Sequence, residues 1–359
     1  MLILGIETSC DDTSIAIIEK QNTQVELLSM VSFSQVELLR KWGGVVPEIA
    51  ARNHLEKITP LLRACLGESK KDISEVDCYA VTTHPGLLGP LLTGLNAAKT
   101  LAMYYEKPIV PVNHLYAHLE AIHLTENISY PYLGLLVSGG HSLYLLVESA
   151  IKFTVLGTTI DDAAGEAFDK GGKLLGLGYP AGRIIDELAK NGDPSSYSFP
   201  IALKGEKKPL LSYSGLKTSL RNLINDQPSI LEQKPDSDEA DDFPQIYKDI
   251  CASYQSAIVI ALSQKLKKAL SVCRHDFNLR KLPIVVGGGV ACNSFLRSEL
   301  IDKFQDVHFV APKYCTDNAA MVANYAARIS DQAIDYPACL EMDAKSRYIN
   351  KNDYSGLKK

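Results

Sequence analysis

Several features that would assign this sequence to a common class of protein are missing. No apolar run approaches the roughly 20 residues that a membrane-spanning helix needs. Residues 1–5 carry no basic or arginine-rich leader and begin a strand pattern at once. The eight cysteines are scattered without Cys-x-x-Cys spacing, so we expect reduced thiols rather than a disulfide framework. A cytoplasmic location without membrane association is therefore expected.

The chain also lacks an excess of positive charge. It has 37 Lys and Arg against 42 Asp and Glu, a net charge of −5. Proteins that bind nucleic acid through global charge are basic, so any contact with RNA would need a local basic patch or a partner. Such a patch could form from Lys204, Lys207, Lys208, Lys217 and Arg221, although an ordinary charged surface is an equal alternative.

The clearest pattern that is present is a repeat of two strands around a short polar turn. Residues 2–6 and 14–19 are apolar and flank one turn, and residues 133–137 and 142–147 flank another. The texts LGIETSCDDTSIAIIE and LGLLVSGGHSLYLLVE align as two copies of one hairpin. A chain of 359 residues has room for two domains. We therefore expect a duplicated α/β domain with a cleft between the halves; two unrelated hairpins are the alternative.

Hydrophobic spacing predicts the remaining elements. Strands are expected at 78–82, 109–112, 283–286 and 308–310. Helices are expected at 47–62 (with helical spacing only until Pro60), 91–105, 161–170 and 250–270. The weakest periodicity is at 191–245, which includes an acidic loop at 234–242.

Two histidines, His114 and His118, lie four residues apart directly after a predicted strand. On a helix such residues share a face, so the two imidazoles can hold one metal ion. A zinc protease of the His-Glu-x-x-His type needs Glu after the first histidine, but Leu115 stands there and cannot take a proton from water. Asp317 is the expected third ligand. The alternatives are core packing for the histidines and a helix N-cap role for Thr316 or Asp317.

Polar and glycine-rich turns are candidate nucleotide contacts. The turn of Ser9, Cys10 and Asp11 can present N–H and hydroxyl groups to a phosphate. The glycines at 139–140 and 287–289 allow close approach of a ligand to the backbone, although neither run matches a Walker A or Rossmann motif. Together with the repeat, they suggest a nucleotide between two lobes.

Three further side chains suit a nucleotide. Asn293 can bond an adenine or ribose edge, and Asp169 and Asp186 can accept hydrogen bonds from ribose hydroxyls. The alternative for both aspartates is a solvated helix face. No Ser/His/Asp or Cys/His set stands out, so no catalytic residue is assigned.

These motifs together resemble those of the bacterial-type tRNA adenosine threonylcarbamoyltransferase family. The resemblance runs from residue 1 to about 345. It rests on GIETSCDDTS (5–14), VPEIAARNH (46–54), a Pro-Gly-Leu loop (85–87), NHxxAH (113–118), VSGGH (137–141), DDAAGEAFDK (161–170), SGLKT (214–218), GGVxxN (288–293) and TDNAAM (316–321).

The resemblance implies an α/β, duplicated actin-like ATPase fold of the ribonuclease H-like type, with two lobes and a nucleotide cleft between them. The expected N-terminal lobe is 1–112 with about 325–345. The expected C-terminal lobe is 113–324 with an inserted segment at about 191–245, and 346–359 form a tail.

The resemblance also implies that His114, His118 and Asp317 hold one divalent metal ion per subunit, iron or zinc, with Fe2+ favoured. ATP or an adenylate is the implied nucleotide ligand. The residues implied to bind threonylcarbamoyl-AMP are Val137, Ser138, Gly139, Gly140, His141, Asp169, Gly182, Asp186 and Asn293.

The implied activity is transfer of the threonylcarbamoyl group from threonylcarbamoyl-AMP to N6 of an adenosine in tRNA. This adenosine lies next to the anticodon, on its 3′ side, in tRNAs that read codons beginning with A. Implied partners besides tRNA are a shorter, inactive paralogue of the same fold and a small P-loop ATPase. The alternatives are a metalloprotease, because relatives have been labelled glycoproteases, and a kinase or ATP-binding module of the same fold.

Overall fold

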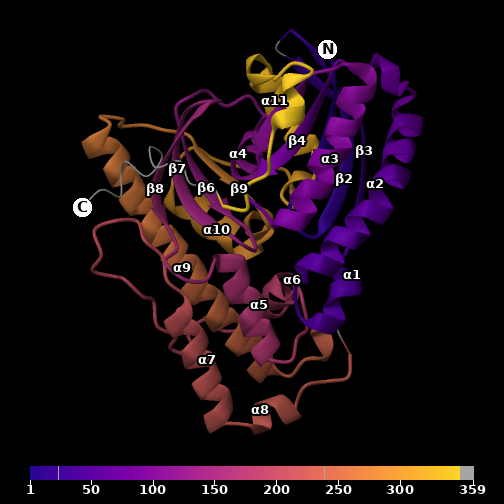
Figure 1. Ribbon diagram of the computed structural model, residues 1–359. Coiled ribbons are helices and arrows are strands. Elements are labelled where there is room, and N and C mark those ends of the chain that lie inside the picture. The colour runs from indigo at the N-terminus through magenta and orange to yellow at the C-terminus, as the bar shows by residue number, and fades with distance from the viewer. Residues whose placement is uncertain (23, 238, 348–359) are drawn as a thin grey trace. The chain divides into compact units, whose positions relative to one another are not determined.

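The computed structural model describes residues 1–22, 24–237 and 239–347, which form two compact units (Figure 1). Of the described residues, the first unit holds 1–128, 149–153 and 313–347; the second holds 129–148 and 154–312. Among the described residues, no helix is both long and apolar enough to cross a membrane.

The first unit is built on a five-stranded sheet in the order β3-β2-β1-β4-β5. Its strands are β1 (Leu2–Glu7), β2 (Asp12–Gln21), β3 (Gln24–Ser34), β4 (Cys78–His84) and β5 (Ile109–Asn113). β1 is buried along its whole length because it lies between β2, its antiparallel hairpin partner, and β4, its parallel neighbour. Successive side chains of a strand point to opposite faces, so Gly5 faces away from Leu4 and Ile6.

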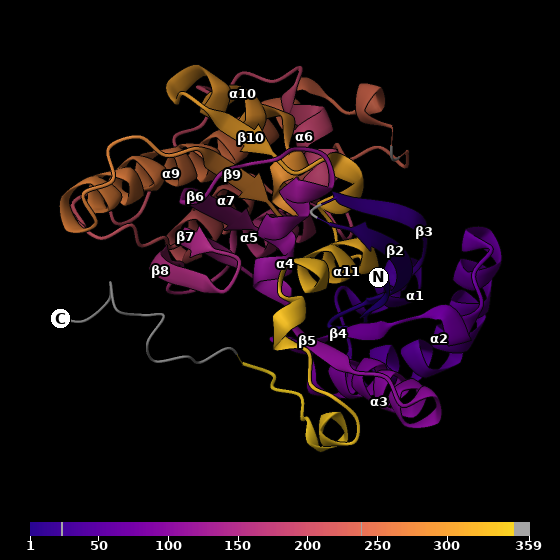
Figure 2. The same ribbon diagram turned by 90° about the horizontal axis from the view of Figure 1, so that it is seen from above.

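Helices cover both faces of this sheet. On the face of Leu4 and Ile6, α2 (Pro47–Ser69) and α3 (Leu88–Tyr105) lie side by side and bury an apolar cluster with the strands (Figure 2). The Gly5 face is covered by α11 (Ala319–Arg328), and a Cβ at Gly5 would lie 2.5 Å from the carbonyl oxygen of Ala319. The unit also contains α1 (Val36–Leu39) and α4 (His114–Glu120).

The second unit repeats the arrangement of the first, with its sheet in the order β10-β9-β6-β7-β8. Its strands are β6 (Tyr132–Val137), β7 (Ser142–Ser149), β8 (Lys152–Thr158), β9 (Ile284–Gly287) and β10 (Val307–Phe309). β6 pairs antiparallel with β7 and parallel with β9, just as β1 pairs with β2 and β4. The predicted hairpin repeat is confirmed, and the fold is a duplicated α/β fold.

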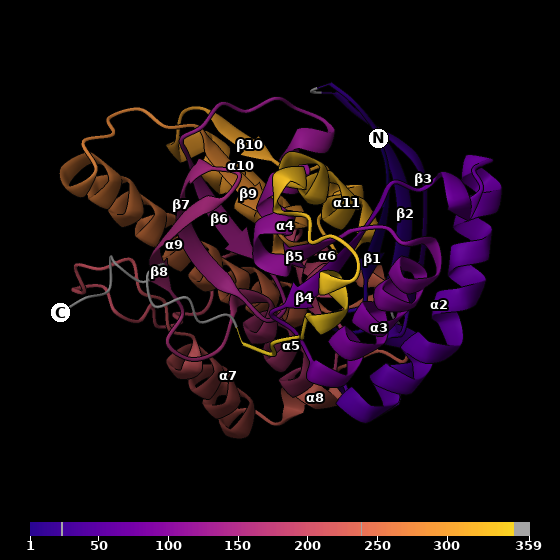
Figure 3. The same ribbon diagram turned by 45° about the horizontal axis from the view of Figure 1, so that its top comes forward.

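The helices of the second unit include a long one that runs along the sheet (Figure 3). They are α5 (Ala164–Leu174), α6 (Gly182–Ala189), α7 (Ser214–Asp226), α8 (Ser229–Glu232), α9 (Gln245–Asp276) and α10 (Ser294–Lys303). The long helix, α9, is tied to the sheet where the Tyr144 hydroxyl donates a 2.8 Å hydrogen bond to the Leu262 carbonyl. The weakly periodic segment at 191–245 contains α7 and α8.

Helix α2 continues through Pro60, where the sequence predicted an end. Proline removes one N–H and blocks the hydrogen bond to the carbonyl four residues earlier. Pro60 lies on the exposed side of the helix, where water can satisfy that carbonyl. Ile58 and Cys65 are buried in the apolar cluster on either side of the proline and hold the helix against the sheet.

The boundaries between the two units differ from the boundaries expected for the two lobes. We expected boundaries after residue 112 and before 325, whereas the units change after Ile128 and before Lys313. The reason is that α4 and α11 pack on each other and on the first sheet. The segments that contain the predicted metal ligands, α4 and the turn before α11, therefore both belong to the first unit. The expected tail at 346–359 lies outside the described residues from position 348 on.

Candidate functional site

Helix α4 presents the two histidines. β5 ends at Asn113, whose side-chain oxygen accepts hydrogen bonds from the N–H groups of Leu115 and Tyr116 and so caps α4. Every residue of α4 is buried. His114 and His118 lie one turn apart, edge to face, with ring centroids separated by 4.6 Å. The predicted helix with both imidazoles on one face is confirmed.

Asp317 reaches the histidines from the turn before α11. The prediction that Thr316 or Asp317 caps this helix is wrong, because Asn318 is the N-cap and its side-chain oxygen accepts a hydrogen bond from the Met321 N–H. The Asn318 amide also donates to the carbonyl oxygens of Tyr314 and Thr316. Asn318 thus fixes the turn, and the Asp317 carboxylate points at the histidines instead of capping the helix.

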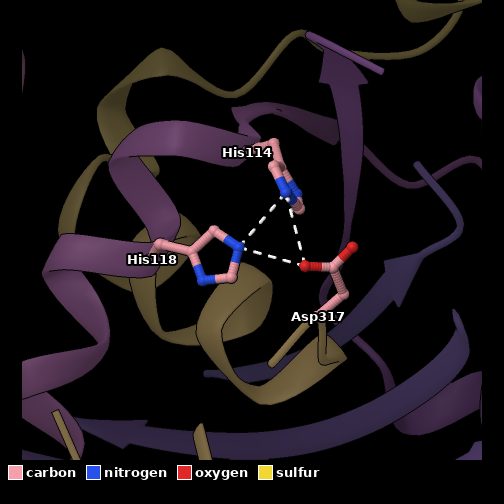
Figure 4. Close-up of side chains that lie close together, drawn as sticks. All are labelled: His114, His118 and Asp317. Atoms are coloured by element: carbon pink, nitrogen blue, oxygen red, sulfur yellow. Dashed lines mark hydrogen bonds and ion pairs between the residues drawn. The ribbon is translucent and has the colours of Figure 1, made fainter. Parts of the chain in front are cut away.

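The three side chains converge on one point (Figure 4). His118 Nε2 lies 3.2 Å from His114 Nε2 and 3.1 Å from Asp317 Oδ1, and the third side of the triangle is 3.5 Å. Ligand atoms about 2.0–2.1 Å from one ion in tetrahedral directions are roughly 3.3–3.4 Å apart. The geometry and the donor types therefore fit a single divalent ion with open coordination positions.

Glu7, at the end of β1, supports His114 from the opposite side of its ring. Its Oε2 lies 3.2 Å from His114 Nδ1 and accepts a 2.6 Å hydrogen bond from the Thr82 hydroxyl. Its Oε1 accepts from the Ser9 N–H at 2.6 Å. A carboxylate on the far nitrogen fixes the ring and turns Nε2 toward the other ligand atoms. Glu7 was not predicted from the sequence, in which the only signal for it is a carboxylate at the end of an apolar strand.

The buried charges shift the pKa values of this group. Burial lowers the pKa of His114, but the carboxylates of Asp317 and Glu7 outweigh it and raise that pKa to about 9. Burial and the charge of His114 lower the pKa of His118. Burial raises the pKa of Glu7, but His114 outweighs this effect and the net shift is downward. These shifts place one positive charge on the histidine pair of the metal-free protein at neutral pH, on His114.

The turn between β1 and β2 lies close to the histidines, and its surroundings are acidic. Burial raises the pKa of Asp12 to about 7 and also raises the pKa of Asp11. The turn is held by His54, whose Nε2 donates a 3.0 Å hydrogen bond to the Cys10 carbonyl. Clustered carboxylates repel a bare phosphate. The expected phosphate role of Ser9, Cys10 and Asp11 stays a prediction, and it requires a cation beside the phosphate.

The second hairpin turn has open backbone. The Ser138 N–H donates to the His141 carbonyl at 2.8 Å, and the His141 N–H donates to Ser138 Oγ at 3.2 Å. A Cβ at Gly139 or Gly140 would meet no atom within 4 Å, so a ligand can approach both.

The glycine-rich loop after β9 must approach the end of β6. Gly288 has a φ of +92°, a conformation that glycine adopts without strain. A Cβ at this position would lie 2.4 Å from the carbonyl oxygen of Val137. This glycine therefore keeps the loop against the second hairpin.

Hydrogen bonds link the other predicted adenylate residues across three helices. Asp169 on α5 accepts a 2.8 Å bond from the Ala181 N–H, directly before Gly182, the first residue of α6. Asp186 on α6 accepts from the N–H of Ser294 at 3.0 Å and from its hydroxyl at 2.8 Å, at the start of α10. Both aspartates are half-buried and bond to protein groups, so neither is bonded to solvent alone. An ionised carboxylate has lone pairs left for a ligand.

Asn293 caps α10 beside a cavity. Its side-chain oxygen accepts a 2.8 Å bond from the Leu296 N–H, and its amide donates to Gln255 Oε1 at 2.6 Å. A cavity of about 290 Å³ adjoins these bonds and is lined by Gln255, Ser294 and Phe295 among others. The nine residues predicted to bind an adenylate thus lie on linked elements of the second unit.

Comparison with known proteins identifies the family. The model of the family TsaD, tRNA N6-adenosine threonylcarbamoyltransferase, matches residues 26–324. The chain belongs to the tRNA N6-adenosine threonylcarbamoyltransferase family. A protein of that name from Treponema denticola is 43% identical over 354 residues, which cover 98% of this chain and 99% of that protein. Its namesake from Brucella anthropi is 43% identical over 354 residues, 97% of this chain and 95% of the other. The chain is therefore a transferase.

Solved structures of other proteins share the fold of this threonylcarbamoyltransferase family member. The activator of 2-hydroxyisocaproyl-CoA dehydratase from Clostridium difficile has a TM-score of 0.51 at 13% identity, over 92% of this chain and 96% of that one. Full-length HypF has a TM-score of 0.54 at 14% identity, over 96% of this chain and 47% of HypF. These likenesses agree with the expected duplicated actin-like ATPase fold.

Proposed function

We propose that this protein transfers the threonylcarbamoyl group of threonylcarbamoyl-AMP to N6 of an adenosine in tRNA. The target adenosine lies on the 3′ side of the anticodon in tRNAs that read codons beginning with A. Family membership carries the reaction class. The main support for the metal site is the triangle formed by His114, His118 and Asp317. Family membership alone would not show that these three side chains lie together.

His114, His118 and Asp317 hold one divalent metal ion in this proposal. Two imidazole nitrogens and one carboxylate oxygen with open positions suit Fe2+, which we favour, and also Zn2+. An ion held by these residues would supply a Lewis acid for a carbamoyl oxygen of the donor. Glu7 keeps His114 in the orientation that ligation requires.

The second unit binds the adenylate part of the donor. The space on the Cβ side of Gly139 and Gly140 is open, so the phosphate or a developing oxyanion can approach the backbone of this turn. Asp169 and Asp186 accept hydrogen bonds from the ribose hydroxyls, and Asn293 bonds the adenosine. The remaining contacts come from Val137, Ser138, His141 and Gly182, as expected from the family pattern.

The reaction needs an activated donor because the lone pair of an exocyclic adenine amine is delocalised into the ring. The mixed anhydride of a carbamate and AMP supplies that activation. The bond from N6 to the carbamoyl carbon forms, the bond from that carbon to the phosphate oxygen breaks, and AMP leaves. The proton that N6 loses is released to solvent, so the products are the modified adenosine, AMP and one proton.

Two residues weaken the metalloprotease alternative. Leu115, in the position where a zinc protease has its general base, is buried and cannot take a proton from water. Glu120, the acidic residue nearest in sequence, is fully buried and accepts a 2.8 Å bond from the Arg328 guanidinium. A kinase of this fold offers no role for the histidine pair.

The partners and location follow from the same proposal. A shorter, inactive paralogue of the same fold and a small P-loop ATPase assist the reaction, and a separate synthase supplies the adenylate. The protein acts in the cytoplasm, where its substrate tRNA is found. Its cysteines form no disulfide among the described residues, in line with a reducing compartment.

Reconstitution tests the proposed function. The full chain, loaded with Fe2+ or Zn2+, is incubated with unmodified tRNA, threonine, bicarbonate, ATP, the adenylate synthase and the two partner proteins. Nucleoside mass spectrometry is expected to show threonylcarbamoyl-adenosine. Peptide cleavage by the metal-loaded protein, abolished by His114→Ala, with no modified nucleoside, would instead support the protease.

The affinity for the metal is expected to rise with pH. The pKa of His114 is raised to about 9, above its ordinary value of 6.5, so at neutral pH this imidazole must lose a proton before it can bind a metal. Affinity for Zn2+, measured by competition with a chelator, should rise about tenfold per pH unit between roughly pH 7 and pH 9. The protonated His114 stabilises the metal-free protein most below pH 6.5, and that stability is lost as pH rises through about 9. A metal affinity that does not change over this range would contradict the assignment of His114 as a ligand.

A further inference from the structure

The loop between α6 and α7 contains Lys204, Lys207 and Lys208 and is hydrogen-bonded to the second half of α9. Lys265 Nζ donates a 2.6 Å hydrogen bond to the Leu203 carbonyl. Lys268, one turn further along α9, donates to the Lys204 carbonyl at 3.1 Å and also to the Glu206 carbonyl. Two ammonium groups therefore hold residues 203–206 in place through backbone oxygens.

The cluster has a large excess of positive charge. Neither Lys265 nor Lys268 forms an ion pair with a carboxylate among the residues that the structure describes. Lys265 is 2% exposed, and burial together with the charge of Lys268 lowers its pKa to about 8. The segments 203–208 and 265–268 contain six lysines and a single acidic residue, Glu206.

A like-charge cluster of this kind costs stability unless an anion neutralises it. The chain as a whole has a net charge of −5, so the cluster stands out against an acidic background. Lys204 and Lys207 are exposed on the loop, and the bonds from α9 hold their backbone in position. The arrangement presents prepositioned ammonium groups to solvent.

We propose that the loop 203–208 and the adjoining face of α9 are a docking surface for the phosphate backbone of tRNA. This inference rests on the proposed function, in which tRNA is the acceptor substrate. An acidic protein needs local basic contacts to bind a polyanion, and lysines supply point charges for successive phosphates. Contacts of this kind position the tRNA and carry no sequence information.

Taken by themselves, the hydrogen bonds of Lys265 and Lys268 could serve only to hold the loop in place. That role does not explain the exposed Lys204 and Lys207, because the loop is held through backbone carbonyls and not through their ammonium groups. Lys217, another lysine of the basic patch predicted from the sequence, is paired with Asp162 at 3.0 Å. The surface is therefore narrower than the sequence suggested.

The double variant Lys204→Gln/Lys207→Gln tests the proposal. Both side chains are exposed, so the fold should be unaffected. The Kd for an unmodified tRNA transcript, measured by fluorescence anisotropy over a range of salt concentrations, is expected to rise about fivefold or more. The slope of log K against log salt should fall by about 0.9 for each lost phosphate contact. The matched control is Lys41→Gln/Lys70→Gln, which removes the same charge from exposed positions in the first unit.

Kinetic measurement of the transfer reaction distinguishes a role of this surface in tRNA docking from a role in catalysis. The double variant should show a raised KM for tRNA and a near-normal rate at saturating tRNA. If wild-type protein modified no tRNA but the variant still lost tRNA affinity, the docking surface would stand and the proposed reaction would fall. An unchanged Kd and salt slope, equal to those of the control, would overturn the surface. Normal tRNA affinity with lost binding of a partner protein would also overturn it and assign the surface to an acidic protein.

Discussion

Replacing Asp317 by alanine is expected to remove the metal ion and nearly all transfer activity while the fold is kept. Asp317 supplies the only oxygen of the three-ligand group, at 3.1 Å from His118 Nε2. Two imidazoles alone hold a divalent ion far more weakly, and a change beside the ligands already lowers metal affinity by about 10–100-fold. We expect a loss on the order of 100-fold or more in the yield of modified nucleoside. Metal content by mass spectrometry should fall in parallel.

The fold should survive this change because Asn318, not Asp317, caps α11. Thr316→Ala is the matched control, since Thr316 is exposed in the same turn and its hydroxyl is not part of the triangle. Circular dichroism of both variants should match the wild type. If the Asp317→Ala protein kept one metal ion per chain and a normal yield of modified nucleoside, the assignment of the metal site would be contradicted.

Replacing Gly5 by alanine is expected to destabilise the first unit and weaken the metal site together. The new Cβ would lie 2.5 Å from the Ala319 carbonyl oxygen and 2.9 Å from the Ala323 Cβ, so α11 must move away from β1. Overpacking of this kind costs about 1–3 kcal/mol. Because Asp317 lies two residues before Ala319, the same shift should displace a ligand atom and lower metal affinity.

Gly67→Ala is the matched control for this prediction. Gly67 lies in α2, and a Cβ there would meet nothing within 4 Å. In a helix, alanine is favoured over glycine by about 1 kcal/mol, so this variant should be neutral or more stable. Scanning calorimetry with and without Zn2+ compares the two. Equal melting temperatures for Gly5→Ala and wild type would show that α11 is not held by close packing on β1.

The sequence predicted those parts of the fold that follow from local patterning. The paired hairpins were visible because each strand is a continuous apolar run and each turn is polar. The helix of His114 was predictable from its spacing after a strand. By contrast, Pro60 misled the prediction for α2, because local propensity carries no information about which face of a helix is exposed.

The features of the candidate site that could not be predicted from the sequence depend on long-range contacts. Glu7 and His114 are separated by more than a hundred residues, and only the pairing of β1, β4 and β5 brings them together. Asp317 could not be separated from a helix cap by sequence, since both roles require a small polar residue before a helix. The Asn318 cap resolved this choice through its geometry.

The discontinuity of the first unit has a consequence for how the protein is made. A ribosome delivers β1 and the histidine helix early, but α11 starts at Ala319, after the whole second unit has been synthesised. Until then the Gly5 face of the nascent sheet has no covering helix, and exposed apolar surface of this kind favours aggregation or chaperone binding. A chain truncated anywhere before Asp317 would lack the third ligand. Metal loading at this site would therefore be confined to molecules whose translation has passed Asp317.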